Sequence, residues 1–333
     1  MFRILRGSLF VTLASLIGLS MPSAAADYPD GPIRVIIPFS PGGGTDVITR
    51  LLQPRIEHAL GTNLIIDNRT GAGGTIGVTI ASREKPDGYT LLITSSSFTF
   101  AQAIYGKKLK YDPKKDFQPI TMLVDQPLVL VVHPSMPVHN VMELIRLAIK
   151  KPGEIFHANA GFGSNLHMST ELFKYMAGQK YYGGKMLPMT AVQFRGGGPS
   201  MIAVISGEVQ VTFTGLQSSK PFREAGQMRP IAVTSKKRSA ALPNVPTIDE
   251  SGVPGYVKGA WTGLYTQAAV PKPIVDKVYQ GVAKVLKDPE LFKILANDGV
   301  TADGRPPEEF TKFVHSEIDK WAVTAKKMGI QMK

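Results

Sequence analysis

Residues 36–61 read IIPFSPGGGTDVITRLLQPRIEHALG, and this stretch predicts an α/β fold. Residues 33–39 form a short apolar run, which is typical of a strand buried on both faces of a sheet. Apolar residues then recur at the spacing of one helical face, at Val47, Ile48, Leu51, Leu52, Ile56 and Leu60. Gly61 follows as a helix stop signal. The stretch therefore predicts a buried strand, a glycine loop and an amphipathic helix.

The glycine loop between this strand and helix indicates an anion site. Gly42, Gly43 and Gly44 let a ligand approach the backbone closely. The free N–H groups and the positive dipole end of the following helix attract negative charge. Thr45 or Asp46 is expected to cap that helix. No Lys follows the glycines and the spacing is not GxGxxG, so an ATP loop and a dinucleotide loop are both disfavoured.

Three similar loops occur further along the chain, at residues 71–75, 161–165 and 196–200. Each combines glycine with a hydroxyl side chain and precedes a helical pattern. Two of the four loops fall in each half of the chain. Facing helix N-termini from the two halves could clamp a small anion without a charged side chain, through backbone N–H groups, Ser164 and Thr45.

Other segments repeat the alternation of strand and helix. Asn140 with Glu143 three residues later forms a capping box ahead of one helix. Small polar loops follow several strand patterns, as at the carboxyl edge of a parallel sheet, where open α/β folds bind ligands. Further strands are expected at residues 64–66, 89–94, 128–133, 156–160, 191–194, 209–214 and 230–234, and late helices at 273–287, 289–297 and 307–327.

The first 26 residues have the pattern of a cleaved secretory signal peptide. Arg3 and Arg6 precede an apolar run that is too short for a comfortable membrane span, and small residues surround the expected cleavage site after Ala26. Cleavage lowers the formal net charge from +12 to +10. The remaining Lys and Arg are scattered, which argues against nucleic-acid binding. With no Cys in the chain, disulfides and thiol chemistry are excluded. We expect an exported, soluble protein.

Catalytic patterns are weak. No His pair has the HExxH spacing, so no metal site is expected. Ser164 and His167 stand three residues apart and are the candidate pair for an exported serine hydrolase, but the GxSxG motif is absent. Trp261 is expected to pack in the core rather than to serve as a ligand platform. No cofactor is expected.

Eight segments occur in one order along nearly the whole chain after residue 26: YPDGPIRVIIPFSPGGGTD, IIDNRTGAGGTIG, KPDGYTLLITSSS, PLVLVVHPSMPV, NAGFGSNLHMSTELF, FRGGGPSMIAVISGEVQVTF, TSKKRSAALPNVPTIDESGVPGY and WTGLYTQAAVPKPIVDKV. Through them the sequence resembles the Bug (TctC-like) family, the periplasmic solute receptors of tripartite tricarboxylate transporters. The resemblance implies a type II periplasmic-binding-protein fold of two α/β lobes (a Venus flytrap), each a mostly parallel sheet flanked by helices. It places lobe 1 at residues 27–127 plus 249–333 and lobe 2 at residues 128–248.

The resemblance also implies which residues grip a small carboxylate in the cleft between the lobes. Backbone groups and ordered water are expected to supply much of the contact. Ser95, Ser96 and Gly197 are weaker candidates. At Thr214-Gly215 many relatives carry an acidic or amide pair, and its loss disfavours an ammonium-bearing ligand. The remaining implied binding residues are Phe39, Ser40, Gly42, Gly43, Gly44, Thr45 and Asp46 on one lobe, and Gly163, Ser164, Asn165 and His167 on the other.

The sequence thus predicts a periplasmic, non-catalytic, monomeric receptor that passes a di- or tricarboxylate, or an aromatic carboxylate, to a membrane permease of the tripartite tricarboxylate type. Ligand binding would shift the population from an open to a closed form. Two alternatives stay open: the exported serine hydrolase, and a sensor subunit that presents its ligand to a kinase.

Overall fold

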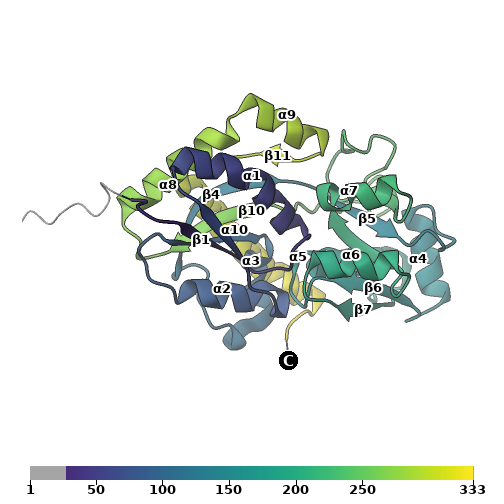
Figure 1. The fold of residues 1–333 in the computed structure, drawn as a ribbon. Coiled ribbons are helices and arrows are strands. Elements are labelled where there is room, and N and C mark those ends of the chain that lie inside the picture. Colours follow the sequence, from purple (N-terminus) through teal and green to yellow (C-terminus); the bar gives the residue numbers. More distant parts are fainter. Residues whose placement is uncertain (1–27, 333) are drawn as a thin grey trace, which may run out of the picture.

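A computed structural model describes residues 28–332 of the chain. The predicted signal peptide at residues 1–26 lies outside the described residues. Within residues 28–332, no helix is both long enough and apolar enough to cross a bilayer. Two sheets form, each covered by helices on both faces, and Figure 1 shows the two halves side by side. This arrangement confirms the predicted two-lobed α/β fold.

The first sheet has six strands in the order β11-β4-β10-β3-β1-β2. β1 pairs in parallel with β2 and β3, whereas β10 runs antiparallel to β3 and β4, and β11 runs antiparallel to β4. The strands are β1 (Ile33–Ile37), β2 (Leu64–Asn68), β3 (Thr90–Ser95), β4 (Phe117–Asp125), β10 (Thr262–Gln267) and β11 (Thr301–Ala302).

The second sheet has five strands in the order β7-β6-β8-β5-β9. β6 pairs in parallel with β7 and β8, and β5 runs antiparallel to β8 and β9. Both sheets are therefore mixed rather than mostly parallel, because strands that enter from distant parts of the chain insert in the opposite direction. The strands are β5 (Leu128–Val132), β6 (Ile155–Asn159), β7 (Met189–Gln193), β8 (Val211–Gly215) and β9 (Arg229–Val233).

The helices bury their apolar faces on the two sheets, which is what their hydrophobic period predicts. On the first sheet, α1 and α8 share a core on one face, while α2, α3 and α10 cover the other. On the second sheet, α4 and α5 cover one face and α6 and α7 the other. The helices are α1 (Gly44–Leu60), α2 (Thr75–Ser82), α3 (Ser97–Tyr105), α4 (Val141–Lys150), α5 (Asn165–Tyr181), α6 (Gly197–Ile205), α7 (Leu216–Glu224), α8 (Lys272–Leu286), α9 (Pro289–Asn297) and α10 (Pro307–Met328).

Local signals place several helix ends. The Asn140 side chain accepts a hydrogen bond from Glu143 N at 2.9 Å, as a capping box requires. Gly61 ends α1 in the left-handed region at φ 71°, and donates its N–H to Glu57 O. α9 spans the predicted residues 289–297, and α10 lies within one residue of its prediction. Short sequence motifs therefore predicted these helix ends.

Two chain segments cross between the sheets and pair with each other. Residues 126–127 follow β4 and lead into β5, and the second crossing lies around Gly259 and Ala260. Ala260 N donates to Gln126 O at 2.8 Å, next to an antiparallel bridge between Pro127 and Gly259. Tyr256 packs in the core of the second sheet. The predicted lobe boundary at 248/249 stays a prediction, and this packing favours a later one.

Candidate functional site

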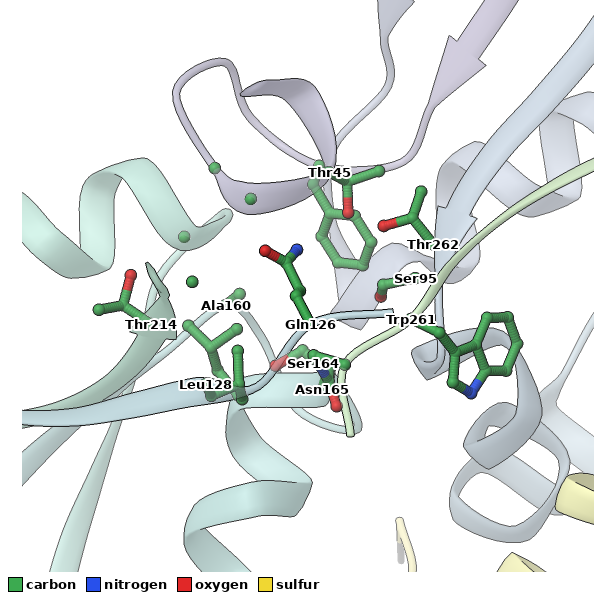
Figure 2. A pocket seen from close by; sticks show the side chains of 17 residues that line it. Thr45, Ser95, Gln126, Leu128, Ala160, Ser164, Asn165, Thr214, Trp261 and Thr262 are labelled. Carbon is green, nitrogen blue, oxygen red and sulfur yellow. The ribbon is translucent and has the colours of Figure 1, made fainter. Parts of the chain in front are cut away.

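A cavity lies where the two halves meet, between the loops at the ends of their strands (Figure 2). Both halves and both crossing segments contribute to its wall. Serine, threonine, glutamine and asparagine side chains supply the polar groups, and none of the lining side chains carries a formal charge. The lining residues are Phe39, Gly43, Gly44, Thr45, Ser95, Gln126, Leu128, Ala160, Ser164, Asn165, Leu166, Gly197, Thr214, Gly215, Ala260, Trp261 and Thr262.

Four helix N-termini converge on this cavity. α1 begins at Gly44, α5 at Asn165 and α6 at Gly197, and all three residues line the wall. Gly215, which also lines it, is the N-cap of α7. The first turn of a helix has free N–H groups and a partial positive charge. A cavity with neutral side chains and four such ends suits an anion better than a cation or a neutral solute.

The first glycine loop places α1 earlier than its apolar pattern indicated. Gly43 is the N-cap with no side-chain cap bond, so the prediction that Thr45 or Asp46 caps the helix is wrong. Asp46 Oδ2 instead accepts from Gly42 N at 3.0 Å, and its carboxylate also binds Arg50 at 3.0 Å. Because these groups hold the carboxylate, Asp46 shapes the loop behind the cavity wall, where Gly42 has φ 75°.

The loop before α5 is held by hydrogen bonds of its own. Ser164 is the N-cap, and its Oγ accepts from His167 N at 3.2 Å. The ring of His167 accepts from Gly163 N through Nδ1, also at 3.2 Å. Burial, with a smaller effect from the positive charge of Lys174, lowers the pKa of His167 to about 4. The imidazole is therefore neutral near pH 7 and braces the loop.

The residues predicted to bind a ligand fall into two groups. Nine line the cavity, and each of the other six is next to a lining residue in the sequence. The nine are Phe39, Gly43, Gly44, Thr45, Ser95, Ser164, Asn165, Gly197 and Thr214. The six outside the lining are Ser40, Gly42, Asp46, Ser96, Gly163 and His167. Whether any of them contacts a ligand stays a prediction.

The loop at residues 71–75 does not line the cavity, although its sequence resembles the other three. It packs instead against the loop before α5 in the other half. A Cβ atom on Gly73 would lie 2.0 Å from Phe162 O, and one on Gly161 would lie 2.7 Å from Gly73 N. The Tyr105 hydroxyl lies 2.7 Å from Ala72 O and 2.8 Å from Phe162 O, bridging both loops.

Sequence reasoning missed Gln126. It lies on the first crossing segment, 5% exposed, and its Oε1 has no hydrogen-bond partner among the described residues. In Figure 2 its amide group points into the cavity. A buried polar side chain without a partner usually awaits a ligand or water. In the sequence, Gln126 stands out only as a polar residue between two strands. The other lining residues missed are Leu128, Ala160, Leu166, Gly215, Ala260, Trp261 and Thr262.

Trp261 contributes to the wall while its ring points away from the cavity (Figure 2). The indole packs edge-on against Phe310 and Phe313, with ring centroids 5.7 and 5.5 Å apart. The prediction of core packing is confirmed, because this ring belongs to the cluster beneath α10.

A serine hydrolase would need the imidazole of His167 to accept the Ser164 hydroxyl proton. Here Ser164 Oγ accepts from the backbone, and no bond joins it to the ring in the described part of the chain. Nδ1 is already engaged by Gly163 N. No group of three His, Asp or Glu side chains within residues 28–332 is placed to hold a metal ion.

The fold and the cavity between its halves define the class of solute-binding proteins. Residues 48–330 match the family described as the tripartite tricarboxylate transporter family receptor, and the chain belongs to that family. It is 31% identical over 317 residues to protein BugT of Bordetella pertussis, covering 95% of each chain.

Solved structures agree in fold. The periplasmic binding protein BugD is 30% identical, with a TM-score of 0.86, and the alignment covers 92% of this chain and 100% of BugD. An R. palustris protein solved with adipate is 34% identical, with a TM-score of 0.86, and the alignment covers 92% of this chain and 100% of that protein. MatC from Rhodopseudomonas palustris, solved with bound malate, is 30% identical with a TM-score of 0.82 over 89% of this chain and 99% of MatC.

Proposed function

We propose that this receptor captures a small carboxylate in the cavity between its halves and delivers it, in the periplasm, to a membrane permease of the tripartite tricarboxylate transporter type. The main support for this proposal is that the N-termini of α1, α5, α6 and α7 converge on a cavity without charged side chains. A carboxylate there would accept hydrogen bonds from backbone N–H groups and from hydroxyls. The adipate and malate bound by two relatives support the same ligand class.

The ligand should lack an ammonium group. No Asp or Glu lines the cavity, and Thr214 and Gly215 occupy the wall where an acid could have balanced a positive charge. Moving an ammonium group out of water without an anionic partner is costly. An acidic amino acid would lose more on entering than the same acid without its amine.

Capture requires the halves to separate and close. The crossing segments supply two adjacent backbone strands at the joint, bridged between Pro127 and Gly259. A ligand that contacts loops from both halves binds the closed form better and therefore increases its population. The permease would then distinguish the closed surface from the open one.

Calorimetric titration of the chain lacking residues 1–26 tests the ligand class. The panel is succinate, malate, adipate, citrate, benzoate, glutamate and aspartate, with adipamide as the uncharged match for adipate. We expect at least one non-amino carboxylate to bind, and adipamide to bind about 100-fold more weakly than adipate if adipate is a ligand, since charge-assisted hydrogen bonds are lost at both ends. Equal binding of acid and amide would contradict the proposal.

Two further outcomes separate the alternatives. Tight binding of glutamate or aspartate alone would contradict the preference for ligands without an amine. Turnover of ester or amide substrates that is abolished by a serine-directed reagent would favour the hydrolase. Thermal-shift screening over the same panel gives an independent readout, because a ligand that binds the folded form raises its stability.

A further inference from the structure

Lys258 is a buried lysine next to the cavity, on the second crossing segment between the sheets. It is 6% exposed. Its ammonium nitrogen, Nζ, donates to Asn165 Oδ1 at 2.8 Å and to Gly259 O at 2.7 Å. Nζ also lies 4.8 Å from the ring centroid of Phe100 and 5.3 Å from that of Trp321. These contacts join α5 of one half to α3 and α10 of the other.

No carboxylate oxygen in the described part of the chain lies within ion-pair distance of Lys258 Nζ. The other buried lysine on this side of the second sheet, Lys174, is paired with Glu171 at 2.8 Å. Two π faces and two neutral oxygens therefore satisfy the donors of Lys258, while no carboxylate pairs directly with its positive charge. Such an arrangement is costly to the folded protein unless an anion comes close.

The contact with Lys258 decides how the Asn165 amide is oriented. An ammonium group can only donate, so the amide oxygen must face Lys258 and the NH₂ group must face elsewhere. Asn165 lines the cavity as the first residue of α5, and nothing among residues 28–332 accepts a hydrogen bond from its NH₂ group. In Figure 2 the amide nitrogen lies on the cavity side and the oxygen on the far side. Two N–H bonds are thus available to a ligand.

We propose that Lys258 is a positioning residue: it fixes the Asn165 amide as a hydrogen-bond donor to one carboxylate group of the ligand and supplies the positive charge behind it. This inference rests on the proposed carboxylate binding and adds a specificity determinant to it. The ligand end that meets Asn165 must be an acceptor, and an anionic acceptor gains further from the ammonium group in a weakly screened setting. An amide or ammonium group at this end is disfavoured.

The surroundings of Lys258 make its charge sensitive to pH near neutrality. Burial lowers the pKa of the Lys258 ammonium to about 7, opposed by the negative charges of Glu317 on α10 and Asp125 at the end of β4, while Lys320 on α10 adds to the lowering. Phe100 on α3 and Asn165 on α5 carry no charge. Glu317 is itself engaged by Lys320 at 2.9 Å. Affinity for a fully ionised dicarboxylate should therefore fall as pH rises above about 7.

A purely structural role would be to brace the halves, since Phe100 and Trp321 belong to a cluster that also contains Met168 of α5. Bracing predicts that loss of the ammonium changes stability and affinity to the same extent whether or not Asn165 is present. Positioning predicts that removing the ammonium lowers affinity only when Asn165 is present. The two roles therefore differ in their coupling to Asn165.

A double-mutant cycle on the full mature chain separates them. Asn165→Ala, Lys258→Met and the double variant are titrated with the carboxylate that binds the unmodified protein most tightly, with Lys174→Met as the matched control for a buried lysine away from the cavity. Expected losses are about tenfold for each single variant and about tenfold, not 100-fold, for the double variant. Lys174→Met should bind within about twofold of the unmodified protein, since its partner Glu171 does not line the wall.

The pH profile of ligand affinity adds a second readout, of the Lys258 charge itself. Between pH 6 and 9 its affinity should decline about tenfold or more, while the affinity of Lys258→Met stays flat. Unchanged affinity in Lys258→Met or a 100-fold loss in the double variant would each overturn the positioning role while leaving carboxylate binding intact. If no carboxylate binds the unmodified protein, the proposed function and this inference fall together.

Discussion

The loops at residues 42–44 and 71–74 look alike in the sequence but do different things in the structure. The first loop leads into α1 at the cavity wall. The second loop is pressed against the other half, where a Cβ on Gly73 would meet Phe162 O at 2.0 Å. Glycine allows close approach to the other half in both places, since a Cβ on Gly43 would lie 3.4 Å from Gly197 N, and in the first loop it also lines the cavity. The comparison separates a loop that lines the cavity as well as meeting the other half from a loop that only meets the other half.

The largest effect is expected from Gly73→Ala. The added methyl group cannot fit against Phe162 O, and the φ of 62° adds strain, so the closed arrangement is disfavoured while each half can still fold. We expect carboxylate affinity to fall about 100-fold, measured by calorimetry, with a larger radius of gyration by small-angle X-ray scattering. Gly61→Ala is the control, since its φ is 71° with nothing within 4 Å of the added atom. Equal affinity in both variants would remove the distinction between the loops.

Next in size is the contrast between Thr45→Ala and Ser164→Ala, two hydroxyl deletions at the cavity wall. Ser164 Oγ caps α5 through His167 N, so its loss should lower the free energy of unfolding by about 1 kcal/mol as well as affinity. Thr45 makes no side-chain hydrogen bond within residues 28–332, so its loss should lower affinity alone, by about fivefold. Urea unfolding and calorimetry measure the two effects. A stability loss confined to Thr45→Ala would contradict the assigned roles.

Acid should weaken the loop that faces Gly73. Burial lowers the pKa of His157 to about 3 and that of His167 to about 4, whereas both titrate near 6.5 when unfolded. Between pH 6.5 and these values the unfolded chain binds more protons, so stability is lost as pH falls. Protonation of His167 also ends its acceptance of the Gly163 N–H. Thermal unfolding should show a falling midpoint below pH 6, and His167→Gln should reduce the slope; an unchanged slope would contradict this.

The smallest effect is expected far from both glycine loops, at the ion pair between Lys220 on α7 and Asp298 beside α9. The pair joins the two halves at 2.8 Å, with the Lys220 side chain 45% exposed. Solvent-exposed ion pairs contribute little. Lys220→Met should therefore change carboxylate affinity by about twofold at low salt and less at 0.5 M salt. If Lys220→Met lost as much carboxylate affinity as Gly73→Ala, the contact that matters most for closure would be this ion pair and not the one at Gly73.

Local patterns predicted much of this architecture. The apolar run that became β1, the capping box at Asn140 and the proline-led helices α8, α9 and α10 all depend on neighbours within a few residues. The antiparallel strands β4 and β10 were not predicted, because they pair across more than 130 residues of chain and carry no local signal for that partnership. The insertion of β10, which runs antiparallel to both β3 and β4, makes the first sheet mixed.

The candidate site was likewise predicted where the signal is local and missed where it depends on distant segments. Glycine loops that precede helices could be found by pattern, and three of the four reach the cavity. The fourth could not be told apart, because only its place in the fold, beside Phe162 and outside the cavity lining, distinguishes it. Gln126 and Lys258 were not predicted as site residues for a related reason. Each is a lone polar residue whose role depends on which distant segment packs beside it.

The aromatic contacts of Lys258 have an optical consequence. Trp261 and Trp321 are the two tryptophans of the chain. Trp321 lies 5.3 Å from the Lys258 nitrogen and 4.3 Å from the Phe100 ring, while Trp261 borders the cavity through its backbone. Indole emission responds to nearby charge and hydration. The emission maximum of the unlabelled protein's intrinsic fluorescence should therefore shift as Lys258 loses its proton. Fluorescence can thus follow the titration of this lysine.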